Sequence, residues 1–577
     1  MNRSLKVVLA WSTASLVVLG GGWRLIGAPG SGSSARGTQA TGQAEGDETL
    51  AVSQSSSTGI RLPAGQFLVG ADKTSLYPQP QNYTPEGDQC DPGPCENPAT
   101  WEKRPSRCDV DSGGVTPPDP EVDPNEPHVR LFTDSDLGWP GHNPNCIYLG
   151  GFDIGPVRGA TGVHDLGVWA RSIAISNGEN TVIFQVLDTV GYFARYRSDI
   201  CDSCGLSDIR QEVSDRLGLG GSQFVSIAST HTHGGADTYG GWGGVPKWYY
   251  HQMRDAAIAS AEAAVANMED ARIVVGSVDA RNFNNERRDH YYSTPDYWAL
   301  WLQAQTPEGA PIATLINHAA HPTQSGSGNT LLHPDWPGAL NNQLEVLYPG
   351  SVGLTIEGGL GNVSAQGSMD NMSKTFSRYL AGEIARTSTQ LQGNQIAAAA
   401  AVIEHPVTNW GELGLSAIGA FDREFTPESP GAGGPMTYSW EKGRGSRTIP
   451  EQIQRQEPPR PEDARSCFAA SPASVRTPIA AYRIGELNVF TGPGELFSNL
   501  TEVIKSKARN NVETMVFGNT NDALGYIIQS FEFDRTTSVV TEYGTQTAEY
   551  EEVFALDACF GDHVLDTMLQ LRGAVGT

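Results

Sequence analysis

Short apolar runs of strand length alternate with Ala-rich amphipathic segments through the middle of the chain, and this alternation limits the possible folds more than any other feature. Thr181–Leu187 and Phe224–Ser229 are short and almost wholly apolar, as strands buried on both faces are. Amphipathic helices are predicted at 248–267 and 374–390. A later strand, Leu487–Phe490, runs into a Gly-Pro-Gly turn. The alternation predicts an α+β fold, here meaning a mixed α/β architecture.

The composition favours a folded protein and excludes one class of partner. The 577 residues include 38% hydrophobic residues and 66 glycines, which is ordinary for a globular chain and enough for a large core. Lys and Arg number 39 against 65 Asp and Glu, so the net charge is −26. A protein that follows nucleic-acid phosphates needs the opposite sign, so nucleic acid is excluded as a partner. The same charge disfavours adsorption to anionic membrane surfaces.

The N-terminus has the pattern of an export signal. A short cationic start precedes an apolar run from Val7 to Gly22, and small residues follow near Ala28. Trp23 and Arg24 interrupt the approach to a cleavage site. Residues 1–28 are therefore interpreted as a signal peptide or as an uncleaved N-terminal anchor, and we expect a secreted, periplasmic or cell-envelope protein.

Composition also predicts the limits of the folded part. The Gly/Ser-rich stretch 29–60 is expected to be a flexible linker, and 61–577 to form one domain. A Cys/Pro/Asp-rich insertion is expected at about 76–145. Its acidic stretch lacks the spacing of an EF-hand, so it is interpreted as a solvated loop. Eight cysteines in an exported chain predict disulfides, whose pairing the sequence leaves open. Cys201-Asp-Ser-Cys204 has no second CxxC motif, so it is expected to be structural rather than a redox or zinc motif.

Histidines follow or precede predicted strands in three places. His231 and His233 come directly after Phe224–Ser229 and are followed by two glycines, which permit close approach. His321 lies in a second His-rich segment, with Asp335 shortly after it, and His164 precedes a third predicted strand. Imidazoles at strand ends are suited to bind a metal ion, and a catalytic zinc ion takes three protein ligands and keeps one position for water.

Glu495 follows the Gly-Pro-Gly turn and has two interpretations. Its carboxylate is placed to complete a metal site after a strand. It equally suits the start of the following helix, where a negative charge interacts favourably with the helix dipole. Spacing alone leaves both interpretations open.

Seven segments in the same order resemble the neutral (non-lysosomal) ceramidase family. The resemblance covers roughly 66 to 571 and implies mixed β-sheets flanked by helices. It also implies a zinc-dependent amidohydrolase that acts in sphingolipid metabolism. The segments are Gly70-Ala-Asp-Lys-Thr, Gly162-Val-His164 with Ala170-Arg171, Ser229-Thr-His-Thr-His-Gly-Gly, Asn317-His-Ala-Ala-His-Pro-Thr, Pro493-Gly-Glu495, Asn521-Asp-Ala-Leu-Gly-Tyr526, and Ala548-Glu-Tyr-Glu551 with Phe560-Gly-Asp-His563.

Carried over to this sequence, the resemblance implies a set of metal ligands. A zinc ion (Zn²⁺) would be held by His164, His233, Glu495 and Tyr526. The spacing around Tyr526 differs from the family pattern, so a packed Gly-Tyr pair is the alternative there.

The resemblance also implies catalytic roles near the metal. His231 would orient or deprotonate the attacking water, or else make a core hydrogen bond. His321 and Asp335 would line the site, or else serve the fold. Arg288 lies near a family Asn-Arg-Ser segment and would either bind an oxyanion or pair with a carboxylate, so it is left outside the candidate site.

Two features depart from the family pattern. Ceramide-cleaving members carry a serine directly after His-Pro-Thr, and Gln324 stands at that position here. The chain also ends about fifty residues after Tyr526, so the family's C-terminal immunoglobulin-like domain is not expected. We therefore expect a divergent member of the family, in which the metal site is retained and the part that contacts the substrate has changed.

These observations favour one function and leave two others open. The first is a secreted zinc-dependent hydrolase that cleaves the amide bond of an N-acyl lipid such as ceramide by zinc-activated water, a route that needs no serine. The second is a zinc esterase or amidase on a smaller, non-sphingolipid substrate. The third is a non-catalytic, zinc-stabilised envelope binding protein. The expected partner is a lipid or a small acylated substrate, reached in the first case by peripheral membrane contact, and the oligomeric state is left open.

Overall fold

The structure is a computed structural model of the chain. It describes residues 51–53, 62–79, 147–152, 155, 158–288, 296–417, 421–427, 473–507, 513–530, 532 and 550–576. All of these belong to one unit, Leu50–Thr577. The predicted signal or anchor at 1–28, and most of the predicted linker and insertion, lie outside the described residues. Within the predicted linker, β1 (Ala51–Ser53) is a strand that pairs with β15.

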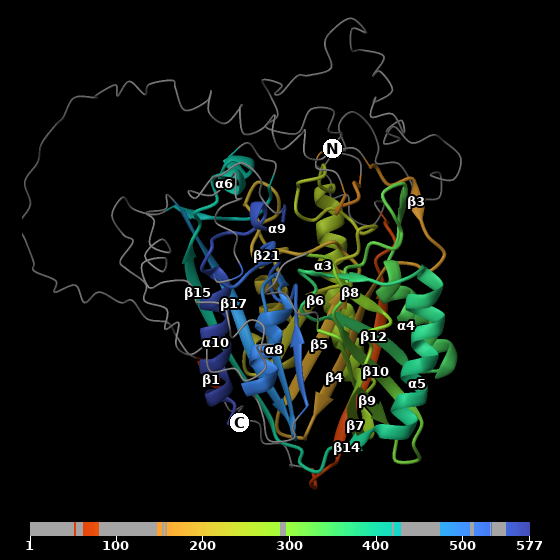
Figure 1. The fold of residues 1–577 in the computed structure, drawn as a ribbon. Coiled ribbons are helices and arrows are strands. Elements are labelled where there is room, and N and C mark those ends of the chain that lie inside the picture. The colour runs from red at the N-terminus through yellow and green to blue at the C-terminus, as the bar shows by residue number, and fades with distance from the viewer. Residues whose placement is uncertain are drawn as a thin grey trace, which may run out of the picture. The chain divides into compact units, whose positions relative to one another are not determined.

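Nine of the described strands form the larger sheet, which is mixed (Figure 1). The order is β12-β10-β9-β7-β2-β4-β5-β6, with β14 beside β7. The β10–β12 and β5–β6 pairs are parallel, and the others are antiparallel. The strands are β2 (Phe67–Ser75), β4 (Trp169–Ser176), β5 (Thr181–Leu187), β6 (Val225–Ser229), β7 (Glu269–Asp279), β9 (Trp298–Gln305), β10 (Pro311–His318), β12 (Val352–Glu357) and β14 (Thr389–Gln390).

The smaller sheet has six described strands in the order β1-β15-β17-β18-β20, with β16 beside β17. β18 and β20 are parallel, and the other pairs are antiparallel. Short two-stranded pairs join β3 (Gly162–Val163) to β11 (Leu331–Leu332), β8 (Asn284–Glu286) to β13 (Val363–Ala365), and β19 (Glu495–Leu496) to β21 (Tyr526–Ile527). The strands of the smaller sheet are β15 (Ile396–Pro406), β16 (Thr426–Pro427), β17 (Ala473–Ile484), β18 (Leu487–Thr491) and β20 (Thr514–Phe517).

The two larger sheets contribute side chains to a shared hydrophobic core. Within the larger sheet, β2 and β7 pair over only three residues. Phe184 of β5 contacts Tyr482 of β17 and Phe517 of β20 edge-to-face, with ring centroids 5.2 and 5.4 Å apart. The next residue, Gln185, points the other way and donates a hydrogen bond to the Ala257 carbonyl at 2.7 Å. This alternation is the period of two that a strand imposes on its side chains.

Helices cover the outer faces of the strand groups. α3 (Lys247–Ala266) packs on β2 and β4 of the larger sheet. α4 (Asp335–Leu347) and α5 (Phe376–Thr387) pack near β9, β10 and β12 of the same sheet. α8 (Ser498–Lys507) and α10 (Phe560–Ala574) pack on the smaller sheet (Figure 1). The other described helical segments are α2 (Leu206–Leu217), 222–224, a π-helical turn at 371–375, α6 (Trp410–Ala417) and α9 (Tyr550–Val553). No helix in the described ranges is long and apolar enough to cross a bilayer.

The predicted fold class is confirmed, because mixed sheets carry helices on their outer faces. Most predicted elements are found within one or two residues of their expected limits. The helix expected at 374–390 is wrong at its C-terminal end, because α5 stops at Thr387. Ser388 is extended and accepts a hydrogen bond from the Trp301 indole at 2.8 Å, and the next two residues join the sheet as β14.

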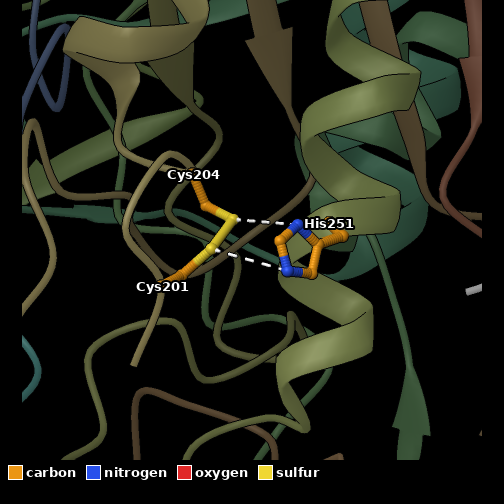
Figure 2. Close-up of side chains that lie close together, drawn as sticks. All are labelled: Cys201, Cys204 and His251. Carbon is orange, nitrogen blue, oxygen red and sulfur yellow. Dashed lines mark hydrogen bonds between the residues drawn. A yellow bond between two sulfur atoms is a disulfide. The ribbon is translucent and has the colours of Figure 1, made fainter. Parts of the chain in front are cut away.

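Cys201 and Cys204 form a disulfide with each other, which agrees with the structural role expected of this motif and supplies a pairing that the sequence left open (Figure 2). It closes the turn immediately before α2, and both sulfur-bearing residues are buried. Cys559, just before α10, is also disulfide-bonded.

Candidate metal centre

The candidate site forms where several strands end. His231 and His233 follow β6, His321 follows β10, and Glu495 begins β19 just after β18. Main-chain hydrogen bonds hold these loops together: the Ser229 amide donates to the Asn519 carbonyl at 2.9 Å, and the Asn519 amide donates to the Gly494 carbonyl at 2.8 Å. The ends of the two sheets thus meet at the site.

The loops of this region contain strained backbone. His231, Asp335, Asn519 and Asn521 have positive φ values between 44 and 66°, and within the described ranges they are the only non-glycine residues that do. Such conformations cost about 1–3 kcal/mol each and persist only where surrounding contacts enforce them. His231, Asn519 and Asn521 lie in loops that follow strands and Asp335 begins α4, so the strained residues lie in the segments that form the candidate site.

Two of the histidines are held in one tautomer by main-chain carbonyls. His231 Nδ1 lies 2.6 Å from the Val190 carbonyl, and His321 Nδ1 lies 3.1 Å from the Leu360 carbonyl. A carbonyl can only accept, so each Nδ1 carries a proton, and it is Nε2 that is left to present a lone pair when a ring is neutral. The two Nε2 atoms are 3.2 Å apart.

Glu495 faces the same point. Its Oε2 lies 3.4 Å from Nε2 of His231 and 3.4 Å from Nε2 of His321. This oxygen is buried and accepts no hydrogen bond from the described residues. Three lone-pair donors therefore converge on one small volume, which is unfavourable unless a cation or a proton lies among them.

His233 completes the cluster from the other side. One nitrogen from each of His231, His233 and His321 lies within 4.8 Å of the others. Nδ1 of His233 is buried without a hydrogen-bond partner among the described residues. Gly151 lies against the ring, and a Cβ there would be 2.3 Å from Cγ of His233, so this position requires glycine.

The electrostatics of the site keep two of the rings neutral. Burial, followed by the neighbouring histidine His231 and then the guanidinium groups of Arg158 and Arg287, lowers the pKa of His233 well below its ordinary value. Burial and then Arg287 do the same to the pKa of His321. Neutral imidazole is the form that binds metal.

Tyr526 lies beside the cluster. β19 and β21 are parallel and in register, with Glu495 opposite Tyr526. The Tyr526 ring is stacked 6.4 Å from the His321 ring, and its hydroxyl oxygen accepts a hydrogen bond from Arg287 at 3.0 Å.

His164 lies apart from the three-histidine cluster. Its Nδ1 accepts a hydrogen bond from the Leu166 amide at 3.2 Å, and its ring lies 4.1 Å from that of His333. His333 in turn donates its amide proton to the Gly234 carbonyl at 2.8 Å. The His164–His333 pair is therefore adjacent to the loop that carries His233.

Asp335 contacts the loop after His321. Its carboxylate accepts hydrogen bonds from the amides of Gln324, Ser325 and Trp336 at 3.0, 2.6 and 2.7 Å. Burial raises its pKa, and these hydrogen bonds oppose the shift. The described contacts make Asp335 a positioning residue that fixes the backbone at Gln324.

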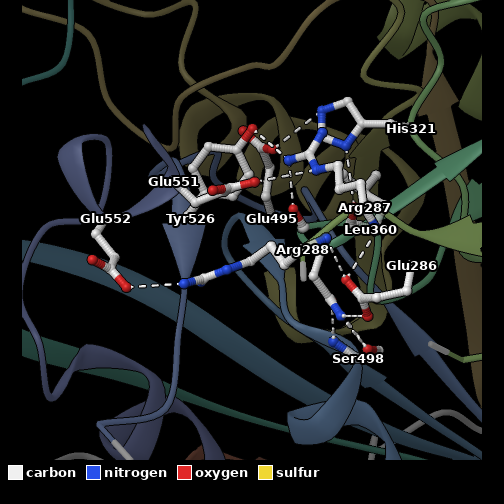
Figure 3. Close-up of polar contacts among 12 residues, drawn as sticks. Glu286, Arg287, Arg288, His321, Leu360, Glu495, Ser498, Tyr526, Glu551 and Glu552 are labelled. Carbon is white, nitrogen blue, oxygen red and sulfur yellow. Dashed lines mark hydrogen bonds and ion pairs between the residues drawn. The ribbon is translucent and has the colours of Figure 1, made fainter. Parts of the chain in front are cut away.

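Arg287 is a residue of the site that the sequence did not reveal. Besides Tyr526 it contacts the Gly361 carbonyl at 2.6 Å and Glu551 at 3.3 Å. Arg288 points away and pairs with Glu552 at 3.0 Å (Figure 3). The two arginines are adjacent in the sequence, and only the direction of the chain after β8 decides which of them faces the histidines.

Comparisons with known proteins support the fold. No family model matches the sequence, and no curated protein matches it either. Among solved structures, the chain is similar to the neutral ceramidase from Pseudomonas aeruginosa, with a TM-score of 0.52 and 15% identity over 89% of this chain and 75% of that one. It is also similar to a ceramidase complexed with C2, with a TM-score of 0.54 and 16% identity over the same shares. The chain thus has a neutral ceramidase-like fold.

Proposed function

We propose that this chain is an exported, zinc-dependent hydrolase that cleaves the amide bond of an N-acyl lipid such as ceramide. The observation that carries the proposal is the convergence of His231, His321 and Glu495, with His233 beside them, at the ends of the strands. The likeness in fold to neutral ceramidases supports the reaction class and the lipid substrate.

The residues present fit a zinc ion. The Nε2 lone pairs of His231 and His321 lie 3.2 Å apart with a carboxylate oxygen 3.4 Å from each, and such a group of donors is stable around a cation. A proton on His321 is unfavourable, because burial and Arg287 lower the pKa of its ring. Imidazole nitrogens with one carboxylate oxygen are a usual donor set for zinc.

Two sets of ligands share His233 and Glu495. The set implied by the sequence resemblance adds His164 and Tyr526. The set that the described distances favour adds His231 and His321. His164→Ala and His321→Ala distinguish them, because the variant that loses zinc from the purified chain identifies the true set.

The protein's own groups prepare the site for hydrolysis. When bound, zinc polarises a carbonyl group and lowers the pKa of water toward about 7. The carbonyls of Val190 and Leu360 fix the tautomers of His231 and His321, so both rings direct Nε2 to the same point. Arg287 donates a hydrogen bond to the Tyr526 hydroxyl and places a positive charge near His321, and a positive charge at the site would stabilise negative charge that develops on a substrate oxygen.

A second candidate is a metal-dependent esterase or amidase on a smaller acylated substrate. Gln324 favours it, because this residue stands where ceramide-cleaving relatives carry serine. Its amide is fixed by Asp335, and its side chain reaches the Ala365 carbonyl at 3.4 Å. A long polar side chain beside the site would favour a more polar substrate.

The deciding experiment measures fatty-acid release from long-chain ceramide by the full chain, with and without a zinc chelator. Release that the chelator abolishes supports the proposal. If the zinc-loaded, folded chain cleaves short N-acyl compounds or water-soluble esters but not ceramide, the second candidate replaces it. Zinc binding without turnover of any of these substrates would point to a binding protein.

A further inference from the structure

A second group of metal-ligating side chains lies outside the candidate metal centre and shares no residue with it. Cys201 and Cys204 flank the turn before α2, and His251 lies in the first half of α3 (Figure 2). Both cysteines are buried, whereas Asp202 and Ser203 between them are exposed. The turn is therefore accessible from solvent although its sulfur atoms are packed against α3.

The imidazole of His251 faces the sulfur pair. Its Nδ1 lies 3.6 Å from Sγ of Cys204, and its Nε2 lies 4.0 Å from Sγ of Cys201. One ligand atom from each of the three residues lies within 4.8 Å of the others. In a tetrahedral zinc site with Zn–S near 2.3 Å and Zn–N of about 2.0–2.1 Å, sulfur and nitrogen are about 3.5–3.6 Å apart. The Cys204–His251 pair already has this separation.

The scaffold of this group does not depend on the disulfide. The bridge joins residues only three apart in the sequence. A disulfide that closes so short a loop restricts the unfolded chain little, so it adds little to the stability of the folded protein. α2 is anchored to the rest of the unit by the buried side chains of Leu206, Ile209 and Val213. Arg254 of α3 pairs with Glu212 of α2 and links the two helices independently. His251 therefore keeps its place when the disulfide is opened.

We propose that reduction of the Cys201–Cys204 disulfide creates a zinc site made of two thiolates and the His251 imidazole. A dithiol reductant supplies two electrons, the S–S bond breaks, each sulfur takes a proton, and the reductant closes its own disulfide. Zinc then displaces the two thiol protons and forms two Zn–S bonds and one Zn–N bond, with the fourth position open to water. The soft sulfur donors select zinc over magnesium or calcium.

The site has a structural consequence. The disulfide ties the turn only to itself, whereas zinc ties the turn to α3 through His251. The same three side chains thus connect the polypeptide differently in oxidising and in reducing conditions.

The test uses the full chain, treated with a water-soluble phosphine under anaerobic conditions and then given Zn²⁺ or Co²⁺. We expect one more zinc ion per chain than in the untreated protein, and a cobalt spectrum with thiolate charge-transfer absorption. Bound zinc should also protect Cys201 and Cys204 from alkylation, which mass spectrometry of the peptide locates. This last readout identifies the site even though other disulfides open.

Variants separate this site from other thiols and from the histidine cluster. The double variant Cys201→Ser/Cys204→Ser should take up no additional zinc, and His251→Ala should bind it at least about tenfold more weakly while keeping both cysteines. Ser203→Ala, on the exposed part of the same turn, should behave as the wild type. Equal zinc uptake by the reduced wild type and the double variant, or equal alkylation of Cys201 and Cys204 with and without zinc, would overturn the proposal.

Discussion

At the scale of single residues, the candidate metal centre depends on hydrogen bonds that orient each imidazole. The carbonyls of Val190 and Leu360 each accept from an Nδ1 atom, and the opposite nitrogens face Glu495. His233 is placed differently, because its ring is packed against Gly151 and its Nδ1 makes no hydrogen bond with the described residues. His233 therefore has a buried nitrogen that forms no hydrogen bond with the described residues.

His233→Ala should lose both the metal and the activity. His233 belongs to both sets of ligands. Removal of a residue that only hydrogen-bonds to a metal ligand lowers metal affinity or activity by about 10–100-fold, so removal of a ligand itself should lower both by more than about a hundredfold. Zinc per chain and fatty-acid release measure the two effects. The matched control is His318→Leu, because His318 is also buried but packs against Trp336 and Phe376. Full turnover by His233→Ala would refute the proposed function.

His318 should make the protein less stable in acid. Burial lowers the pKa of its ring from 6.5 to about 4. Between these two values the unfolded chain binds a proton that the folded chain does not, so the stabilisation is present above pH 6.5 and is lost as the pH falls to 4. The loss amounts to about 3 kcal/mol in the free energy of unfolding. Urea denaturation at pH 7 and pH 4.5 should show a smaller decrease for His318→Leu than for the wild type; equal decreases would contradict this.

At the scale of elements, α3 approaches β2 more closely than a side chain would allow. A Cβ on Gly70 would lie 2.1 Å from the Ala264 carbonyl oxygen at the end of α3. Gly70 begins one of the segments that resemble the ceramidase family, and its physical role is to let the helix lie directly on the strand. The packing of α3 also places His251 next to the Cys201–Cys204 turn.

Gly70→Ala should therefore destabilise the fold. The added methyl group meets main-chain atoms rather than a flexible side chain, so either α3 or β2 must shift. Overpacking of this kind costs about 1–3 kcal/mol. Gly382→Ala is the control, because Gly382 lies in α5 with open space around it, and alanine there should add about 0.5–1 kcal/mol of stability. Chemical denaturation of both variants measures the difference, and equal stability of Gly70→Ala and the wild type would argue against this packing.

At the scale of the whole molecule, the candidate metal centre connects parts of both sheets. His231 and His233 follow β6 of the larger sheet, and Glu495 follows β18 of the smaller one. A ligand that binds only the folded state stabilises it, and here the stabilisation acts on the junction of the two sheets.

Zinc should therefore raise the midpoint of thermal unfolding of the untreated, disulfide-bonded chain. Free zinc at a hundred times its dissociation constant adds about 2.7 kcal/mol to the free energy of unfolding. This corresponds to a rise of a few degrees in the midpoint temperature. Scanning calorimetry with zinc and with a chelator measures the shift. His233→Ala should show no shift, and a full shift in that variant would place the zinc elsewhere.

The sequence predicted much of the fold because strands and helices follow from local periodicity. β5 was expected at its observed limits, and β6, β18 and α3 within one residue or so. The C-terminal end of α5 was not predictable, because pairing of residues 389–390 with β7 outweighs the local preference for helix. That competition depends on a strand more than a hundred residues earlier.

For the candidate site, the sequence determined which residues were available, and the tertiary structure decided which of them meet. The positions of His231 and His233 after a buried strand follow from a short stretch of chain. The contact of His231 with His321 spans 90 residues, and that of Arg287 with Tyr526 spans 239. Such contacts arise from how two sheets pack and how loops turn after their strands. No local pattern carries that information, so Arg287 and the partner of His164 emerged only from the folded chain.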